Sequence, residues 1–313
     1  MRRLYTTLGP LSADQLGMIL PHEHVFVDLR TPDKPGYAEA SVDEVLALMV
    51  PQIEAIKALG VTALVECSTG GVGRRADFDL AVSRATNFPI VVPTGNYREP
   101  WIPDWVASAS EEALHDWMLA ELQHGMEKTG VKAGWIKLSA GDDGMTRLEE
   151  RILRAATRAA IATDALIGSH TIRSRVVMDQ LDIIAAEGGS ADRFLSIHTQ
   201  AEPDFGLHKA LVERGAWIEY DNVGAVPVAE SAGLVMRALE AGLGNKLLIS
   251  HDRGWFDPAL PGGGVAKPYT VVSTELLPML AAAGVDRQSI VTLTHTNPFN
   301  AFSRPWPMSR AAR

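Results

Sequence analysis

The sequence predicts a (β/α)8 barrel of the α/β class, formed by residues 1–313 as a single domain. Eight short apolar runs alternate with longer amphipathic segments rich in alanine and leucine, and polar residues repeatedly follow the short runs directly. Such alternation implies parallel strands joined by right-handed crossovers, which an open doubly wound sheet would also satisfy. Eight units with polar residues at the strand ends favour the closed barrel, with a site at the carboxyl ends of its strands.

The predicted strands are short and rich in β-branched residues. Each is bounded on at least one side by Gly, Pro, Ser or Asn, as strand ends commonly are. In chain order they are Met18–Leu20, Val61–Glu66, Pro89–Pro93, Trp135–Leu138, Leu166–Gly168, Phe194–Ile197, Trp217–Tyr220 and Lys246–Ile249.

The segments between the strands have the spacing of amphipathic helices. In the first, Ser41 and Glu44 form the sequence pattern of a capping box, and Pro51 should kink or split the helix that follows. The other predicted helices are Glu111–Met126, Arg147–Ala162, Ser174–Ala186, Phe205–Glu213, Val228–Ala241 and Val272–Ala283, with Arg74–Thr86 as a weaker candidate.

Three long segments rich in Pro and Gly are expected to be loops: Arg30–Ala40, Tyr97–Ser110 and Trp255–Pro268. Long loops at the catalytic face of a barrel usually shape the substrate pocket. We therefore expect these three to lie around the site.

Composition excludes several classes of protein. The formal net charge of -9 repels phosphate backbones, so we expect no nucleic-acid partner. The single cysteine, Cys67, cannot form a disulfide within the chain, which is compatible with a cytoplasmic location. No apolar run follows Met1–Tyr5 as in a signal peptide, and no stretch is long enough to cross a bilayer, so we expect no membrane association.

The first strand ends in Pro21-His22-Glu23-His24. Because alternate residues of a strand share a face, His22 and His24 can point into the barrel together. Two imidazoles on one side are a pair of metal ligands. Two unrelated polar residues at a strand end would give the same pattern.

Lys137 lies inside the short apolar strand Trp135–Leu138. A buried lysine is costly unless it is neutralised or paired. A neutral amine can capture carbon dioxide as a carbamate, whose two oxygens would bridge two metal ions. An ion pair with a neighbouring carboxylate is the simpler explanation for this residue taken alone.

Three further ligand types follow later strands: His170 the fifth, His198 the sixth and Asp252 the eighth. Strand alternation lets only one of His251 and Asp252 point inward, and we choose Asp252 because a carboxylate can both bind a metal and accept a proton. Polar groups at the ends of five strands converge on the rim where barrel active sites lie. Six nitrogen and oxygen ligands suit two ions such as zinc, cobalt, manganese or iron.

These residues resemble the phosphotriesterase family of the amidohydrolase superfamily, including its phosphotriesterase-like lactonases, over nearly the whole chain. His22-Glu23-His24 is similar to the family's first-strand H-x-H, Lys137 to its carboxylated lysine, and Asp252 to its last metal ligand. Gly168-Ser169-His170-Thr171 and Ile197-His198-Thr199 are similar to the segments of its third and fourth histidines. Leu16-Gly17-Met18 and Asn297-Pro298-Phe299-Asn300-Ala301-Phe302 are similar to its opening turn and its closing motif.

The resemblance implies a binuclear hydrolase that acts on a small-molecule lactone or ester, and many members of the family are homodimers. One ion, with zinc expected first, would be held by His22, His24 and Asp252, and the other by His170 and His198. Carboxylated Lys137 and a hydroxide would bridge the ions. The hydroxide would open a lactone ring or attack a phosphorus centre, and Asp252 would transfer the proton.

Residues outside the ligand set bear on the substrate. Tyr97 resembles a tyrosine that lactonase-type members place beside the metals, although it could equally anchor a loop. Arg253 and Trp255 are candidates for substrate contacts because they directly follow Asp252. The segment Tyr220–Gly224 and the loop after Asp252 lack the pattern of acyl-homoserine lactonases, so the substrate is not specified.

Three alternatives stay open at this stage. The main activity could be that of a phosphotriesterase or carboxylesterase, with lactone opening as a side reaction. The barrel could bind metal without catalysis, although the presence of all six expected ligands argues against a decayed site. Lys137 could form a Schiff base in a metal-independent enzyme, which the clustered histidines disfavour.

Overall fold

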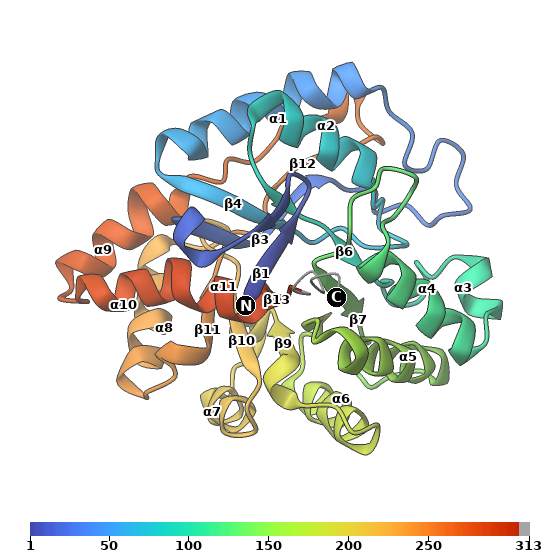
Figure 1. Ribbon diagram of the computed structural model, residues 1–313. Coiled ribbons are helices and arrows are strands. Elements are labelled where there is room, and N and C mark those ends of the chain that lie inside the picture. Colours follow the sequence, from blue (N-terminus) through green and yellow to red (C-terminus); the bar gives the residue numbers. More distant parts are fainter. Residues whose placement is uncertain (307–313) are drawn as a thin grey trace, which may run out of the picture.

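The computed structural model describes residues 1–306 and contains the predicted barrel (Figure 1). Helices surround the strands as an outer ring, and the strands form two parallel ladders, in the orders β12-β3-β4-β5 and β6-β7-β8-β9-β10-β11. Only Val92 separates β5 from β6, which joins the ladders at one edge. At the other edge, the amide of Asp252 donates to the carbonyl of His22 over 3.2 Å and closes the barrel.

Every predicted strand is present, although the predicted strand Pro89–Pro93 is divided into β5 and β6. The barrel strands are β3 (Met18–Phe26), β4 (Val61–Glu66), β5 (Ile90–Val91), β6 (Pro93–Thr94), β7 (Trp135–Ser139), β8 (Ile167–His170), β9 (Phe194–Ile197), β10 (Trp217–Tyr220) and β11 (Leu247–Ile249).

Two strand predictions are corrected. β3 is longer than the predicted Met18–Leu20, because its polar end pairs with its neighbours and continues to Phe26. A short strand that was predicted as loop, β12 (Gly254–Phe256), pairs in parallel with the end of β3. Both differences lie at the carboxyl ends of the strands. There the hydrogen-bonded ladder continues beyond the last residue of the apolar pattern.

The outer helices also agree with the prediction. They are α1 (Val42–Ala58), α2 (Ala76–Thr86), α4 (Glu111–Gln123), α5 (Arg147–Thr163), α6 (Ser174–Ala186), α7 (Phe205–Glu213), α8 (Val228–Glu240) and, after the π-helical turn Val272–Leu276, α9 (Leu277–Ala282). The short helix α3 (Asp104–Ser108) lies within the predicted loop Tyr97–Ser110.

The first helix shows one confirmed and one wrong prediction. Ser41 and Glu44 form the capping box, each side chain accepting the other's backbone amide over 3.2 Å. The split expected at Pro51 does not occur, and α1 runs as one helix. Because Pro51 has no backbone N–H, the carbonyl of Ala47 loses its usual donor. Both residues lie on the exposed side of the helix, where water can satisfy that carbonyl.

Elements that the apolar pattern did not predict close the amino ends of the strands. They are the antiparallel strands β1 (Arg2–Thr6), β2 (Gly9–Leu11) and β13 (Arg304–Pro305), and the helix α11 (Asn297–Phe302), which the short helix α10 (Arg287–Val291) precedes in the chain. Phe299 and Phe302 of α11 join Leu4 in packing against the inward-facing residues of the barrel, including Trp135. In Figure 1, α11, β1 and β13 lie across the centre of the ring.

Within residues 1–306, no helix has both the length and the apolar character that a membrane span requires.

Asn297 anchors α11 to the barrel. Its buried side-chain amide donates to the carbonyls of Gly244 at 2.7 Å and Leu247 at 2.8 Å, at the start of β11. Without the side-chain amide of Asn297, both carbonyls would lack this donor.

Replacing Asn297 by alanine should therefore lower the free energy of unfolding by about 2–4 kcal/mol, since a buried group that loses its partner costs roughly 1–3 kcal/mol. Urea unfolding followed by circular dichroism measures this change. Asn300→Ala is the matched control in the same helix, because Asn300 is exposed. Equal stabilities of the two variants would show that Asn297 is not an anchor.

Candidate metal centre

The carboxyl ends of the strands enclose a cavity of about 190 Å³. All six predicted ligands line it, although they come from five different strands or strand ends. The lining residues are His22, His24, Val27, Leu29, Cys67, Val72, Tyr97, Lys137, His170, His198, Asp252 and Trp255.

The first group of donors is His22, His24 and Asp252. Alternation along β3 turns both imidazoles to the same side. An oxygen of Asp252, Oδ1, lies 2.9 Å from Nε2 of His24 and 3.5 Å from Nε2 of His22. Donors about 2.1 Å from a tetrahedral ion lie roughly 3.4 Å apart, so this spacing fits a metal ion.

The second group is His170 and His198. Nδ1 of His170 lies 2.7 Å from Nε2 of His198, and the two rings are nearly perpendicular, with an interplanar angle of 85°. Two nitrogens that face each other in this way can hold one ion after a small separation of the rings.

Lys137 is buried on β7, with only 2% of its surface exposed. No carboxylate of residues 1–306 forms an ion pair with its ammonium group, so the simpler explanation from the sequence, a neighbouring ion pair, is not observed. Nζ lies 5.8 Å from the ring centroid of Trp135, the inward residue below it. An amine buried in this way needs another means of compensation.

The backbone is strained at two of the donors. His198 has φ 61° and Asp252 has φ 54°, in the left-handed region that residues other than glycine rarely adopt. Strained residues of this kind persist only where their surroundings fix them, and they cluster at functional sites.

His251 and Asp252 point to opposite sides. Asp252 lines the cavity, whereas Nδ1 of His251 lies 2.5 Å from Glu23 and its Nε2 accepts the amide of Val272 at 2.8 Å. His251 therefore packs outside the cavity and ties the chain before α9 to β3.

Two buried carboxylates behind the histidines were not identified from the sequence. Oε2 of Glu219 lies 2.8 Å from Nδ1 of His22, and Oδ1 of Asp221 lies 2.7 Å from Nδ1 of His198. A carboxylate on Nδ1 fixes the tautomer and leaves Nε2 for a metal. Strand alternation, which places Trp217, Glu219 and Asp221 on one face, is the signal that could have revealed them.

His22, His198 and Asp221 also lie close enough together to suggest an ion site of their own. Their closest approaches, however, use the Nδ1 atoms, which already form hydrogen bonds with carboxylates. The Nε2 atoms on the cavity side are the ones that remain available to an ion.

The electrostatics prepare most of the donors to bind metal. Burial, together with the charge of Lys137, lowers the pKa of His22 to about 4, and burial beside His198 lowers the pKa of His170 well below its usual value. For His24, burial lowers the pKa, but hydrogen bonds to Asp252 and Glu66 outweigh it and raise the pKa to about 9.

Burial raises the pKa of Asp252, but the charge of His22 and the hydrogen bond from His24 outweigh it, so the net shift is downward. Asp252 is therefore ionised at neutral pH, as a metal-binding carboxylate must be.

Of the three residues predicted to contact substrate, two line the cavity and one does not. The ring centroid of Tyr97 lies 5.1 Å from that of His170, and that of Trp255 lies 5.7 Å from that of His24; both residues line the cavity. Arg253 does not line it, and its guanidinium donates to the carbonyl of Gly224.

The three long loops contribute unequally to the cavity. Tyr97 and Trp255 are the first residues of two of them, but Arg30–Ala40 supplies none of the lining residues, so its predicted role in the pocket is wrong. Leu29, just before that loop, lines the cavity in its place.

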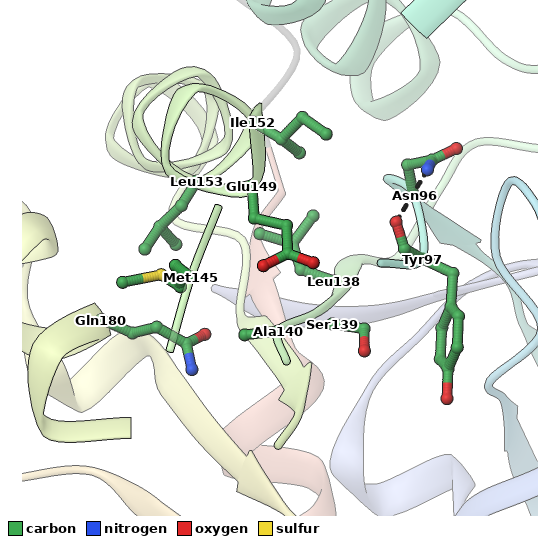
Figure 2. A pocket seen from close by; sticks show the side chains of 10 residues that line it. All are labelled: Asn96, Tyr97, Leu138, Ser139, Ala140, Met145, Glu149, Ile152, Leu153 and Gln180. Carbon is green, nitrogen blue, oxygen red and sulfur yellow. Dashed lines mark hydrogen bonds between the residues drawn. The ribbon is translucent and has the colours of Figure 1, made fainter. Parts of the chain in front are cut away.

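A second, much smaller cavity lies between β7 and α5 (Figure 2). Glu149 and Ile152 line it from α5, opposite Ser139 and Ala140, while the ring of Tyr97 extends away from Glu149. Its volume of about 10 Å³ is that of a single water. It is too small for a substrate, and none of the six predicted metal ligands lines it.

Comparisons with known proteins agree with this site. The phosphotriesterase family model matches residues 2–302. A phosphotriesterase homology protein of Mycobacterium tuberculosis is 31% identical over 322 residues, covering 97% of this chain and 98% of that protein. An aryldialkylphosphatase of Saccharolobus solfataricus is 25% identical, covering 94% and 97%.

Among solved structures, a mutant of a PTE-like lactonase from Deinococcus radiodurans is 28% identical, with a TM-score of 0.84, and the match covers 96% of this chain and 99% of that one. The family model thus matches almost all of the sequence, and one relative matches over nearly its whole length. The chain belongs to the phosphotriesterase family and is an enzyme that hydrolyses ester bonds.

Proposed function

We propose that this chain is a binuclear metal hydrolase whose main activity is the opening of lactone rings, with phosphotriester hydrolysis as a side activity. The observation that carries the proposal is the convergence of six donor residues on one cavity large enough for a small substrate. The family to which the chain belongs is one of binuclear metal hydrolases.

In this proposal one ion is held by the first group of donors and the other by the second. Lys137, carboxylated by carbon dioxide, would supply oxygen ligands to both, which would explain why a lysine is buried there without an ion-pair partner among the described residues. Zinc suits the set of imidazole and carboxylate donors, and so do cobalt, manganese and iron. The proposed ligands are His22, His24, Lys137, His170, His198 and Asp252.

When bound, such ions lower the pKa of water toward neutrality and polarise an ester carbonyl. Asp252 accepts the proton that water loses and returns it to the leaving alkoxide, since its carboxylate lies in the cavity and is ionised at neutral pH. Burial raises the pKa of Tyr97 to about 12, so its hydroxyl stays protonated and can donate to the oxygen of the carbonyl.

Apolar side chains form the rest of the pocket. Val27, Leu29, Val72 and Trp255 surround the donors and would pack against the hydrocarbon part of a substrate. Trp255 is the stronger candidate for a substrate contact, whereas the position of Arg253 supports a role in joining two loops.

Lactones are favoured over phosphotriesters by Tyr97, which lies against His170, and by the PTE-like lactonase among the similar structures. The aryldialkylphosphatase relative favours the second candidate, a phosphotriesterase or carboxylesterase as the main activity.

We further propose that residues 1–313 form one domain that assembles as a homodimer. Pairing of β1 with β13 joins the two ends of the described chain in one sheet, which supports the single domain. The homodimer and a cytoplasmic location rest on the resemblance and the cysteine content alone. The net charge of -9 supports the absence of a nucleic-acid partner.

A substrate panel on zinc-reconstituted protein tests the main activity. The expected result is a kcat/KM for the best lactone at least about tenfold above that for the best phosphotriester, varying with ring size and side chain, a difference of about 1.4 kcal/mol in transition-state binding. A higher value for the phosphotriester would reverse the assignment, and no turnover of either would remove it.

Lys137→Ala should lose most of the bound metal, because the carbamate bridge is absent. Metal content is measured by mass spectrometry after removal of free ions, with Lys132→Ala as a control that keeps about two ions per chain. Full occupancy with wild-type activity in Lys137→Ala would rule out the bridge.

Asp252→Asn should lower kcat by about two to four orders of magnitude, the usual scale for general acid–base catalysis. Because Asp252 is also a proposed ligand, rates are normalised to the metal content of each preparation. A normalised kcat equal to that of the wild type would exclude Asp252 as the proton acceptor.

A further inference from the structure

One carboxylate touches a donor of each proposed metal ion. Oδ1 of Asp221 lies 2.7 Å from Nδ1 of His198, and its Oδ2 lies 3.3 Å from Nδ1 of His22. His22 belongs to the first group of donors and His198 to the second. Asp221 is fully buried, with none of its surface exposed.

Asp221 is itself held on several sides. The side-chain amide of Gln200 donates to its Oδ1 over 2.6 Å, and the backbone amide of Asp221 donates back to Gln200 over 3.2 Å. Oδ2 also accepts the backbone amide of His198 over 3.1 Å, which helps to hold that residue in its left-handed conformation. The carboxylate therefore cannot turn toward one histidine without changing its contact with the other.

Glu219 lies on β10, two residues before Asp221, and provides a comparison with it. It is fully buried, and its Oε2 lies 2.8 Å from Nδ1 of His22. No hydrogen bond joins it to His198, and its Oε1 has no hydrogen-bond partner among residues 1–306. Glu219 thus contacts a histidine of one group of donors, whereas Asp221 contacts a histidine of each.

We propose that Asp221 is a positioning residue that couples the two metal sites, so that an ion in either site raises the affinity of the other. With an ion bound at its Nε2, the ring of His22 would be fixed, and with it the hydrogen bond of Nδ1 to Glu219 and the contact of Nδ1 with Asp221. Asp221 is then held in the position that directs Nε2 of His198 toward the second ion. Coupling between sites is reciprocal, so the order of filling does not matter. This inference rests on the binuclear site of the proposed function.

Titration of metal-free protein with Zn²⁺, followed by isothermal calorimetry, tests the coupling. The wild-type chain should bind two ions, the second more tightly than independent sites allow. Asp221→Asn should weaken both ions by about 10- to 100-fold, the usual cost of losing such a carboxylate, and should reduce the coupling to the part that the proposed Lys137 bridge supplies. Glu219→Gln should weaken one ion only and keep the coupling.

Titration with Mn²⁺ provides a readout that does not depend on activity. At one ion per chain, the electron paramagnetic resonance spectrum of the wild type should already show spin-coupled pairs, because coupled sites fill together. Asp221→Asn should show a clearly larger share of isolated Mn²⁺ at that ratio. If Asp221→Asn does not fold, Gln200→Leu, which frees the carboxylate without removing it, should show the same loss of coupling.

The outcomes separate this inference from the proposed function. Coupling as strong as in the wild type in both Asp221→Asn and Gln200→Leu, or equal effects of Asp221→Asn and Glu219→Gln on both ions, would overturn it. A wild type that hydrolyses lactones but fills its two sites independently would also overturn the coupling and leave the function standing. Two coupled ions in a chain that hydrolyses no ester would support the coupling and remove the function.

Discussion

The backbone hydrogen bond from the amide of Asp252 to the carbonyl of His22 closes the barrel, and the site depends on that closure. The hydroxyl of Ser250 reinforces it by accepting the amide of His22 over 3.0 Å. These contacts bring together donors from the two ends of the sequence, and the intervening strands place the rest on the same rim. Parallel strands end on one side, so a polar residue after each becomes part of a single cavity.

Such a concentration of buried polar groups is stable only if each group has a partner. Carboxylates lie on the Nδ1 side of three histidines: Glu66 and Asp221 beside His24 and His198, and Glu219 beside His22. Glu66 also accepts the amides of Val25 and Ser68, so the same group supports the ladder and the ligand. Because these carboxyl groups hold the Nδ1 atoms of the three imidazoles, the remaining nitrogens face the cavity.

The barrel was predictable because its strands are short apolar runs between turn residues, and the helices have clear amphipathic spacing. The strand ends were less predictable, since β3 continues through His22 and His24, where hydrogen bonding and not burial of apolar surface defines the strand. The hairpin of β1 and β2 and the helix α11 have no repeat to identify them, and they are fixed by packing against the floor of the barrel.

The donor residues were accessible from the sequence because ligand types follow successive strands. Their supporting residues were not, since Glu219 stands in a run that is otherwise apolar and aromatic, and Asp221 follows that run without a motif that marks it. Which ring nitrogen of a histidine faces the cavity depends on these supporting carboxyl groups, and their positions depend on the fold.

The most direct test of a shared binuclear centre is anomalous diffraction from crystals of the zinc-loaded protein, measured above and below the zinc absorption edge. The account predicts two anomalous peaks about 3.5–4 Å apart in the cavity, one beside His22, His24 and Asp252 and one beside His170 and His198, with added density on Nζ of Lys137 between them. No peak among these residues, or donors dispersed without an ion, would contradict it.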